Sequence, residues 1–472
     1  MVDSFDLLML GAALCALAFG LVRRVRMWSA GLPAGPAERS GERGKGMLRD
    51  AVAHVRILRD PAPGLMHLGI FLGFGLLLLA AALAVSGVSL PRPLAAAAAL
   101  VLDLAGLGAL AGTAYALLRR YVLKPPRLDN RVEDLWVLLL IAGILLTGVA
   151  TTALGIARGG GGPFPKPAGW AVSLPLGLLG ADATAALQPW VWKVHFLLIC
   201  GFFAAIPYTR LVHVVASPLN VFFRNLRPRG EASKPNLEDE TADHFGVSAV
   251  EHLGWKDVLD LDACTRCGRC QDGCPAHLTE KPLSPKKAIQ DMKRKWLADW
   301  GAILERRASG AKAEEGGASL VDEFVGRDAI WACTTCRYCE EHCPVFVEPV
   351  SKLLEMRRHL VLTESAPPPE MNQTYKNLEN NGNPWGIGFS TRGDWAAALD
   401  VPLLGEGAPE IEVLYWTGCA GAFDDRNKKI SEAMVRIFRA AGVPFAILGP
   451  DATCCGDPAR RTGNEYLYQM QA

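Results

Sequence analysis

CTRCGRCQDGCP at residues 264–275 and CTTCRYCEEHCP at residues 333–344 decide how this chain is interpreted. Each run has the spacing C-x2-C-x2-C-x3-C-P, in which three cysteines wrap a loop around three irons of a [4Fe-4S] cubane and a distant cysteine supplies the fourth thiolate. The spacing predicts one cluster on Cys264, Cys267, Cys270 and Cys343, and a second on Cys333, Cys336, Cys339 and Cys274. Zinc knuckles and disulfides are the alternatives, but zinc sites rarely need four cysteines in such a run followed by proline.

Apolar residues are concentrated in the first half of the chain. The sequence has 472 residues, 50% of them hydrophobic, a mean hydropathy of +0.18 and a formal net charge of +1. This exceeds one domain and gives no sign of a nucleic-acid-binding surface. Stretches long enough, at about 20 residues, to cross a lipid bilayer as helices occur at residues 5–22, 65–88, 96–118, 133–157 and 191–216. We therefore expect a five-helix transmembrane bundle over residues 1–217.

The placement of lysine and arginine predicts the orientation of this bundle. Cations crowd two connecting segments, 23–59 and 119–131, while the two opposite loops are nearly free of them. The crowded segments, and everything after the fifth stretch, are therefore expected in the cytoplasm, with the chain in the inner (cytoplasmic) membrane of a bacterium or archaeon. Arginines follow the first apolar run, which favours an anchor over a cleaved signal peptide. A reducing cytoplasm agrees with cysteines that bind metal.

Histidines in or beside the apolar stretches predict haem. His195 and His213 are eighteen residues apart, which is five turns of a continuous helix, so both would project from one face of the fifth stretch. If the second and fifth helices are antiparallel, His67 lies level with His195 and His54 with His213. Each pair could then hold one haem b between two imidazoles. The alternative is that a lone histidine only bonds a neighbouring helix. Asp103, in the third stretch, could pass protons to a quinone or could pair near the outer surface.

The remainder of the chain divides by composition. We expect a polar linker over 218–250, a helical two-cluster domain over 251–361, a linker over 362–407 and a final α/β unit over 408–472. Strands are predicted at 411–416 and 444–448, with a helix at 428–441 between them. This last unit contains Cys419, Cys454 and Cys455. The vicinal pair resembles the CCG motif, which in full form continues to a later C-x2-C. Without that later C-x2-C, we expect the site to be incomplete or to be completed by other ligands. The alternative that these three cysteines bind nothing stays open.

The chain resembles known electron-transfer families. The five-span region with its histidines resembles the gamma (cytochrome b) subunit of respiratory nitrate reductase, and the rest resembles the iron-sulfur subunits of heterodisulfide reductase. The fused order is similar to that of membrane-bound heterodisulfide reductase-related proteins, among them electron-transfer-flavoprotein:menaquinone oxidoreductases. GLMH (64–67), LDACTRCGRC (261–270), WACTTC (331–336) and DDRNKK (424–429) carry the resemblance. The expected fold is mainly α: a five-helix bundle, a helical ferredoxin-type domain and a partial α/β cysteine-rich domain.

The resemblance implies an oxidoreductase that passes electrons from reduced electron-transfer flavoprotein, or another soluble donor, to a membrane quinone such as menaquinone. The implied cofactors are two [4Fe-4S] clusters, two haem b groups and a possible further non-cubane [4Fe-4S] cluster at the CCG motif. No G-x-G-x-x-G follows a predicted strand, so hydride chemistry is expected in a partner. Two other functions stay open. One is a quinol-dependent heterodisulfide or thiol-disulfide reductase, and the other is a relay subunit of a larger complex.

Overall fold

The computed structural model is mainly helical and describes residues 3–33, 38–88, 90–159, 161–228, 230–240, 242, 244–309, 319–405 and 410–472. The chain divides into two compact units that interleave along the sequence. Unit 1 contains residues 1–227, 253–315 and 337–349, and unit 2 contains residues 228–252, 316–336 and 350–472. The mainly α fold predicted from the sequence is confirmed.

The elements of unit 1 are almost all α-helices. Its α-helices are α1 (Ser4–Ser29), α2 (Ser40–Met47), α3 (Pro61–Val85), α4 (Arg92–Leu117), α5 (Val132–Gly159), α6 (Pro167–Gly177), α7 (Ala181–Ala205), α8 (His213–Phe222), α9 (Trp255–Ala263), α10 (Arg269–Asp272), α11 (Pro275–Leu278), α12 (Pro285–Ser309) and α14 (Tyr338–Glu341). Its 3-10 and π-helical turns are η1 (Leu48–Val52), η2 (Ile57–Arg59), η3 (Leu118–Leu123), η4 (Ile206–Tyr208) and η5 (Arg210–Val212).

Unit 2 combines helices with one short sheet. Its α-helices are α13 (Arg327–Ala332), α15 (Pro349–Arg358, from its second residue), α16 (Pro369–Asn381), α17 (Gly418–Phe423), α18 (Asp425–Ala440), α19 (Asp457–Arg461) and α20 (Glu465–Gln471). Its 3-10 and π-helical turns are η6 (Val250–His252), η7 (Leu320–Val325), η8 (His359–Thr363), η9 (Phe389–Leu399) and η10 (Gly449–Asp451). Its strands are β1 (Val413–Leu414) and β2 (Phe445–Ala446).

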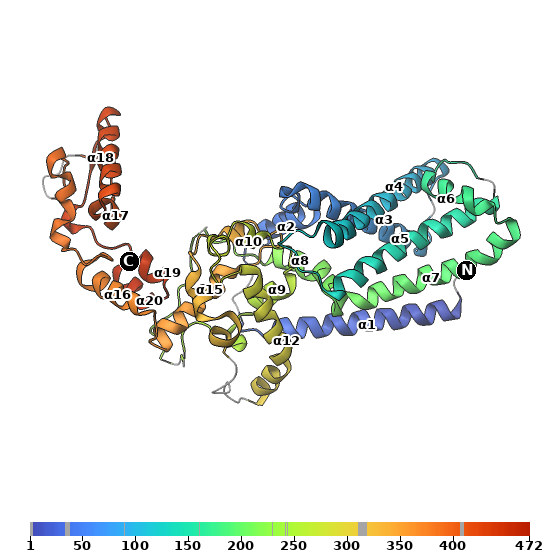
Figure 1. The fold of residues 1–472 in the computed structure, drawn as a ribbon, viewed down its shortest axis with the longest axis horizontal. Helices are drawn as coiled ribbons and strands as arrows, with labels where there is room; N and C mark the ends of the chain where they lie inside the picture. The colour runs from blue at the N-terminus through green and yellow to red at the C-terminus, as the bar shows by residue number, and fades with distance from the viewer. Residues whose placement is uncertain are drawn as a thin grey trace. The chain divides into compact units, whose positions relative to one another are not determined.

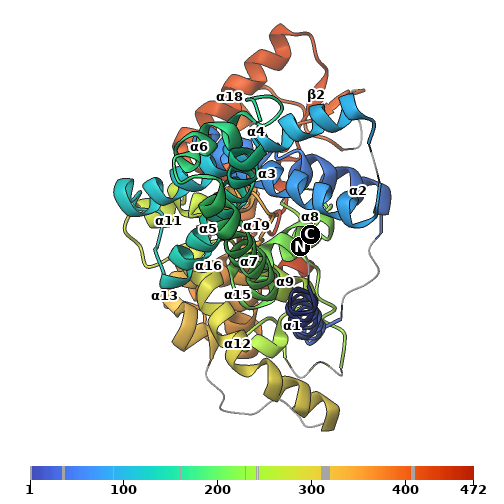
Figure 2. The ribbon, with the colours of Figure 1, turned by 90° about the vertical axis from the view of Figure 1, so that its right-hand side faces the viewer.

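Five helices of unit 1 are long and apolar enough to cross a membrane: α1, α3, α4 with its extension η3, α5 and α7. They lie side by side in the two ribbon views (Figures 1 and 2). The interior of the bundle contains residues such as Ile141, Ile144 and Phe202. Large apolar side chains also face outward, as at Leu8 and Phe19, both 69% exposed. An apolar exterior over five helices is what contact with lipid requires.

The fifth membrane helix differs from the prediction of 191–216. It begins at Ala181, and its membrane-length segment ends at Tyr208. Pro207 cannot donate a helical hydrogen bond, and Thr209 is extended, with its hydroxyl accepting from the backbone N–H of Leu211. His213 therefore begins a separate helix, α8. The prediction that His195 and His213 share one face of a continuous helix is wrong for this reason.

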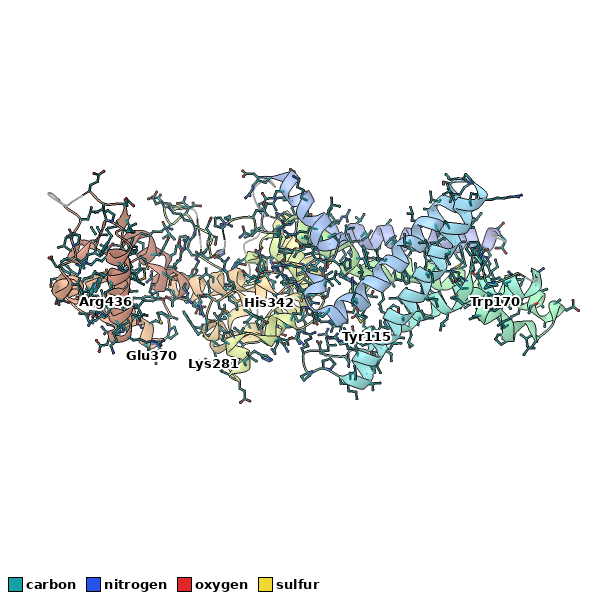
Figure 3. All side chains as sticks on the ribbon, turned by 90° about the horizontal axis from the view of Figure 1, so that it is seen from above. Tyr115, Trp170, Lys281, His342, Glu370 and Arg436 are labelled. Atoms are coloured by element: carbon teal, nitrogen blue, oxygen red, sulfur yellow. The ribbon has the colours of Figure 1, made fainter. Side chains whose placement is uncertain are left out.

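Asp103, in the membrane helix α4, caps the short helix α6. Its carboxylate accepts hydrogen bonds from the backbone N–H groups of Ala168 at 2.7 Å and Gly169 at 3.4 Å, which would otherwise be unpaired at the helix start. In Figure 3, Trp170 on α6 and Tyr115 near the end of α4 lie toward opposite ends of the bundle. Of the two roles considered for Asp103, the structure favours pairing.

A buried carboxylate joins the membrane helices of unit 1 to the first cysteine run. Asp134, in the first turn of α5, is 2% exposed. Its oxygens lie 3.3 Å from Arg120 and 2.9 Å from Arg266, and it also accepts from Arg210. Arg266 lies between Cys264 and Cys267, so this ion network attaches the cysteine loop directly to a membrane helix.

The sheet of unit 2 is a two-stranded parallel pair, with Val413 opposite Phe445 and Leu414 opposite Ala446. The helix between the strands, α18, packs Val435 against Phe445, so the predicted strand-helix-strand order is present. Parallel pairing requires such a crossover. Trp395 of η9 packs in the same core.

A second buried carboxylate, Asp262 at the end of α9, connects α1 and α12. It accepts from Arg24 at 3.2 Å, from Lys293 at 3.0 Å and from the indole N–H of Trp28 at 2.8 Å. Burial alone would raise the pKa of Asp262, but the charges of Lys293 and Arg24 outweigh burial and lower it. The carboxylate is therefore ionised and paired at neutral pH.

We expect Asp262→Asn to lower the free energy of unfolding by about 3 kcal/mol, because two cations would lose their buried partner. Thermal unfolding of the detergent-solubilised chain measures the change. In the unsubstituted chain the contribution is present at neutral pH and is lost as the pH falls below about 4. Glu42→Gln is the matched control, because the Arg39–Glu42 pair is about half exposed and such pairs contribute about 0–1 kcal/mol. Equal effects of the two substitutions would contradict the prediction.

Candidate metal centres

The two cysteine runs adopt the same backbone turn. In the first run, φ is positive at Arg266 (55°) and Gly268 (79°), and in the second it is positive at the equivalent Thr335 (55°) and Arg337 (61°). Non-glycine residues rarely adopt this conformation, which costs roughly 1 kcal/mol or more each unless surrounding structure enforces it. In the first run this turn places Cys264, Cys267 and Cys270 around one cavity.

Four cysteines predicted to share a cluster line one cavity in unit 1. They are Cys264, Cys267 and Cys270 from the first run and Cys343 from the second. Cys339 also lines this cavity. Apolar residues, including Ile289 of α12, Val345 and Val347, complete the lining. The crossover of Cys343 into the first loop is the arrangement that a cubane requires of this spacing.

The buried thiols of this cavity act on one another. Burial, together with the charges of Cys267 and Cys264, raises the pKa of Cys343 to about 12, although the backbone N–H of Val347, which bonds its sulfur at 3.2 Å, acts to lower it. Burial and the neighbouring thiols also hold the pKa of Cys270 well above its usual range. Without a cation, Cys270 and Cys343 are therefore protonated. Iron would supply the positive charge that lets all four become thiolates and release their protons.

The alternative of mononuclear zinc finds no support in the geometry. Among the described residues, no group of three or more His, Cys, Asp or Glu side chains is arranged to hold a single metal ion. Zinc needs its ligands within about 2.3 Å of one point, whereas a cubane spreads its four thiolates over four irons. Four thiols around one cavity are what a cubane requires.

The first loop is held against the membrane helices by a close backbone approach. A Cβ atom at Gly268 would lie 2.4 Å from the carbonyl oxygen of Arg127, in the segment between α4 and α5. Gly268 also has positive φ. Only glycine satisfies both constraints. A Cβ at Gly273 would similarly lie 2.2 Å from the Tyr338 ring, so the two cysteine runs also meet without space for a side chain.

The cysteines predicted for the second cluster are divided between the units. Cys274 and Cys339 belong to unit 1, and Cys333 and Cys336 belong to unit 2. Within unit 2, the sulfur of Cys333 accepts from the backbone N–H of Thr335 at 3.4 Å. The second cluster stays a prediction from the spacing.

The three remaining cysteines of interest gather in unit 2. Cys419 lies in α17, and Cys454 and Cys455 follow η10. Burial raises the pKa of Cys419 and of Cys454, and Cys455 acts on both in the same direction. The sulfur of Cys454 accepts from the backbone N–H of Gly456 at 3.4 Å. The three thiols are thus electrostatic neighbours, as a shared site requires.

Three of the four predicted haem histidines come together in unit 1. The His67 and His213 ring centroids are 6.3 Å apart, and Nε2 of His54 lies 2.9 Å from Nδ1 of His67. Two imidazoles bound to opposite sides of one metal ion, with bonds of about 2 Å, have ring centroids about 6 Å apart. The separation of His67 and His213 therefore fits one haem iron between them.

The hydrogen bonds assign a proton to each ring. Nδ1 of His213 lies 2.6 Å from the carbonyl oxygen of Arg210 and must donate to it, which leaves a lone pair on Nε2. Nδ1 of His54 donates to the carbonyl of Val52 at 3.0 Å, so its Nε2 accepts from Nδ1–H of His67. His67 then also presents a free Nε2. Burial lowers the pKa of both His54 and His213, so their rings are neutral at pH 7.

The pairing expected from the sequence differs from this arrangement. His54 was expected to pair with His213 across one haem, and that pairing stays a prediction; in the structure Nδ1 of His54 bonds the Val52 carbonyl and its Nε2 bonds His67. His67 was expected opposite His195. His195 instead lies against Trp192, and its Nδ1 is 3.0 Å from the Thr147 hydroxyl. The break after Tyr208 places His213 on a different helix from His195. A second haem at His195 stays a prediction.

Comparison with known proteins assigns the parts of the chain. Residues 62–227 match the nitrate reductase gamma subunit family, residues 260–347 match the 4Fe-4S dicluster domain, and residues 413–472 match the cysteine-rich domain. The chain is a fusion of these three domain types. The fusion predicted from the sequence is thereby confirmed. No solved structure matches the chain.

Several relatives share all or part of the fused order. The chain is 40% identical over 456 residues to the EtfAB:quinone oxidoreductase of Syntrophomonas wolfei, covering 88% of this chain and 63% of the relative. It is 31% identical to the probable iron-sulfur-binding oxidoreductase FadF of Bacillus subtilis, covering 88% and 64%. It is 28% identical over 216 residues to one polypeptide of the dihydromethanophenazine:CoB–CoM heterodisulfide reductase of Methanosarcina acetivorans, covering 45% and 50%. The fusion thus spans less than two thirds of these relatives.

Sequence reasoning missed the arginines around the centres. Arg210 donates to the carbonyl of Thr265, beside Cys264, and Arg269 donates to the carbonyls of Arg56 and Ile57. Arg392 lies in a segment that was predicted to be a linker. The sequence could have indicated Arg269, because it lies between two cysteines of the first run. Arg210 and Arg392 carry no local pattern that distinguishes them from surface arginines.

We expect Cys343→Ser to remove about four irons per chain, the content of one cubane, because its cavity would lose the fourth thiolate. Iron and acid-labile sulfide analysis of the purified chain measures the loss. Cys15→Ser is the control, since Cys15 is exposed on α1. Unchanged iron in the Cys343 variant would show that this thiol is not a ligand.

We expect His67→Ala and His213→Ala each to remove the absorbance of one haem b, whereas His54→Ala keeps that haem and shifts its midpoint potential. The reason is that His54 contacts His67 and would not contact the iron, and such supporting partners tune a metal rather than hold it. Optical redox titration of each variant measures both quantities. Loss of all haem in His54→Ala, with the chain still folded, would contradict this assignment.

Proposed function

We propose that the chain is a membrane oxidoreductase that passes electrons between a soluble donor and a membrane quinone. Its four-cysteine cavity would hold a [4Fe-4S] cluster, and His67 and His213 would hold one haem b. The observation that carries the proposal is that both sites belong to the same compact unit and are joined by hydrogen bonds. When bound, these groups supply one-electron chemistry. The protein's contribution is to hold, orient and shield them.

The shortest connection runs through Arg210. Its side chain donates to the carbonyl of Thr265, which adjoins Cys264, and its own carbonyl accepts from Nδ1–H of His213. One residue therefore contacts the cluster loop and fixes a haem ligand. This couples the orientation of the imidazole to the position of the cluster.

A second connection runs through the segment that follows His54. Arg56 donates to the carbonyl of Glu341 at 2.6 Å, in the second cysteine run. Arg269, in the first run, donates to the carbonyls of Arg56 at 3.1 Å and Ile57 at 2.8 Å. Both runs thus clamp the segment that orients His67. Polar contacts of this kind hold the segment in place.

The membrane side of the proposal rests on the five apolar helices. The cations crowded between the first two spans and between the third and fourth support a cytoplasmic position for those segments and for the cluster-bearing residues. The inner membrane of a bacterium or archaeon is then the location. A quinone dissolved in the lipid would exchange electrons with the haem. Menaquinone is the type that the sequence resemblance implies.

The donor is proposed from the relatives. One relative carries the name EtfAB:quinone oxidoreductase, which supports reduced electron-transfer flavoprotein as the soluble partner. The sequence has no dinucleotide-binding fingerprint, so flavin or nicotinamide chemistry would take place in that partner. The cluster region would receive single electrons from it.

A second candidate function is reduction of a disulfide by quinol. The observation that favours it is the gathering of Cys419, Cys454 and Cys455, together with the similarity to a heterodisulfide reductase polypeptide. The three thiols would then be the reactive centre rather than an entry point. A relay role within a larger complex is the third possibility.

Electron entry tests the proposal. In proteoliposomes, we expect reduced electron-transfer flavoprotein to reduce the haem and a menaquinone analogue to reoxidise it. Cys343→Ser should slow the first step at least 100-fold while dithionite still reduces the haem, because only the cluster is lost. Stopped-flow absorbance measures both steps, with Cys15→Ser as the control.

The other outcomes separate the alternatives. Haem oxidation by a disulfide substrate, with no response to flavoprotein, would favour the reductase. Activity only after other subunits are added would favour the relay role. Rapid haem reduction by flavoprotein in the Cys343→Ser chain would contradict the proposal that electrons reach the haem through the cluster.

A further inference from the structure

A buried arginine without a full set of partners lies in unit 2. Arg392, on η9, is 2% exposed. Its Nη2 donates to the carbonyl of Gly382 at 2.7 Å, but its Nε and Nη1 are buried and bond to none of the described residues. Its guanidinium lies over the Phe423 ring, 5.3 Å from the centroid.

This arginine adjoins the three cysteines of unit 2. Phe423 ends the helix that contains Cys419, so Arg392 packs on the same short helix, α17. A Cβ at Gly382 would lie 3.4 Å from Nη2 of Arg392 and 3.7 Å from the backbone nitrogen of Cys454. The Arg392 charge also opposes the burial that raises the pKa of Cys419 and Cys454. Geometry and electrostatics agree that the guanidinium and the thiols share one site.

An unpaired guanidinium at this depth is costly. Burying an ion without a compensating partner costs several kcal/mol, and an arginine stays protonated in proteins. Within residues 319–405 and 410–472, no carboxylate forms an ion pair with Arg392. The two free N–H groups therefore require an anion that the described residues of this unit do not supply.

We propose that Arg392 is the counter-ion of an anionic sulfur group bound at Cys419, Cys454 and Cys455, donating from Nε and Nη1 to its sulfur atoms. The sulfur could come from an iron-sulfur cluster held by the three thiolates or from the thiolate of a small substrate. Arg392 is a positioning and charge-compensating residue in either case. The inference is independent of the donor and quinone proposed above.

A purely structural arginine would behave differently. If Arg392 served only to bond Gly382 and stack on Phe423, its removal would destabilise the chain whether or not the site is filled. If it is a counter-ion, removal of the unpaired charge leaves the empty chain equally or more stable. Only the filled chain then loses stability.

The experiment uses the full chain, made iron-free or reconstituted anaerobically with iron and sulfide. Arg392→Met removes the charge, Arg392→Lys keeps it, and Arg436→Met is the matched control on α18, where Arg436 is 73% exposed. The iron and the EPR signal that are lost in Cys454→Ser, compared with the parent chain, belong to the three-cysteine site. The readouts are the midpoint potential of that signal, its rate of loss to a chelator and the unfolding temperature.

We expect Arg392→Met to lower the midpoint potential, because a nearby positive charge favours the reduced cluster. Loss to the chelator should be about 10-fold faster, in line with the usual effect of outer-shell residues on metal affinity. Arg392→Lys should restore most of the potential, and iron-free Arg392→Met should unfold no earlier than the iron-free parent. Unchanged potential and chelator loss, or equal destabilisation of empty and filled chains, would overturn the proposal.

A substrate thiolate is the source if Cys454→Ser and the parent chain contain the same iron. Equilibrium dialysis with radiolabelled 2-mercaptoethanol then replaces the EPR readout. Weakening of its binding by about 10-fold in Arg392→Met would support the counter-ion role. Equal binding by the two chains would overturn it.

Discussion

The carboxylate of Asp134 is the contact on which unit 1 depends. It is buried in the first turn of a membrane helix and is held by Arg120, Arg210 and Arg266. Arg266 belongs to the cysteine loop, and Arg210 fixes the ring of His213 through its carbonyl. A single ion network therefore positions the thiols, the imidazole and the helix. Removing one member of such a buried network leaves uncompensated charge, so the parts are expected to be stable only together.

Much of the architecture could be predicted from local sequence signals. Apolar runs of membrane length and the repeated C-x2-C-x2-C-x3-C-P spacing are local patterns, and both matched the structure or the family comparisons. The strand-helix-strand order at the end of the chain was equally local. Their common feature is that the signal and the structure occupy the same short segment.

The histidine arrangement was harder to predict because it depends on a helix end. Eighteen residues make five turns only if the helix is continuous, and Pro207 followed by extended Thr209 ends that continuity. His54 adopts a left-handed backbone conformation with φ of 59°, which no helical periodicity describes. Arg392 became significant only when folding brought η9 to the cysteines. These are effects of tertiary structure, in which the separation of two residues in the sequence does not predict their distance in the fold.

The interleaving of the two units has a practical consequence for dissection of the molecule. The polypeptide passes between the units at residues 228, 253, 316, 337 and 350. No single cleavage point separates them, and a boundary placed just before the second cysteine run would leave Cys343 on the other fragment from its three partners. Separate study of the two fragments on either side of that boundary therefore begins with a divided cluster site, and both cysteine runs need to stay on one polypeptide.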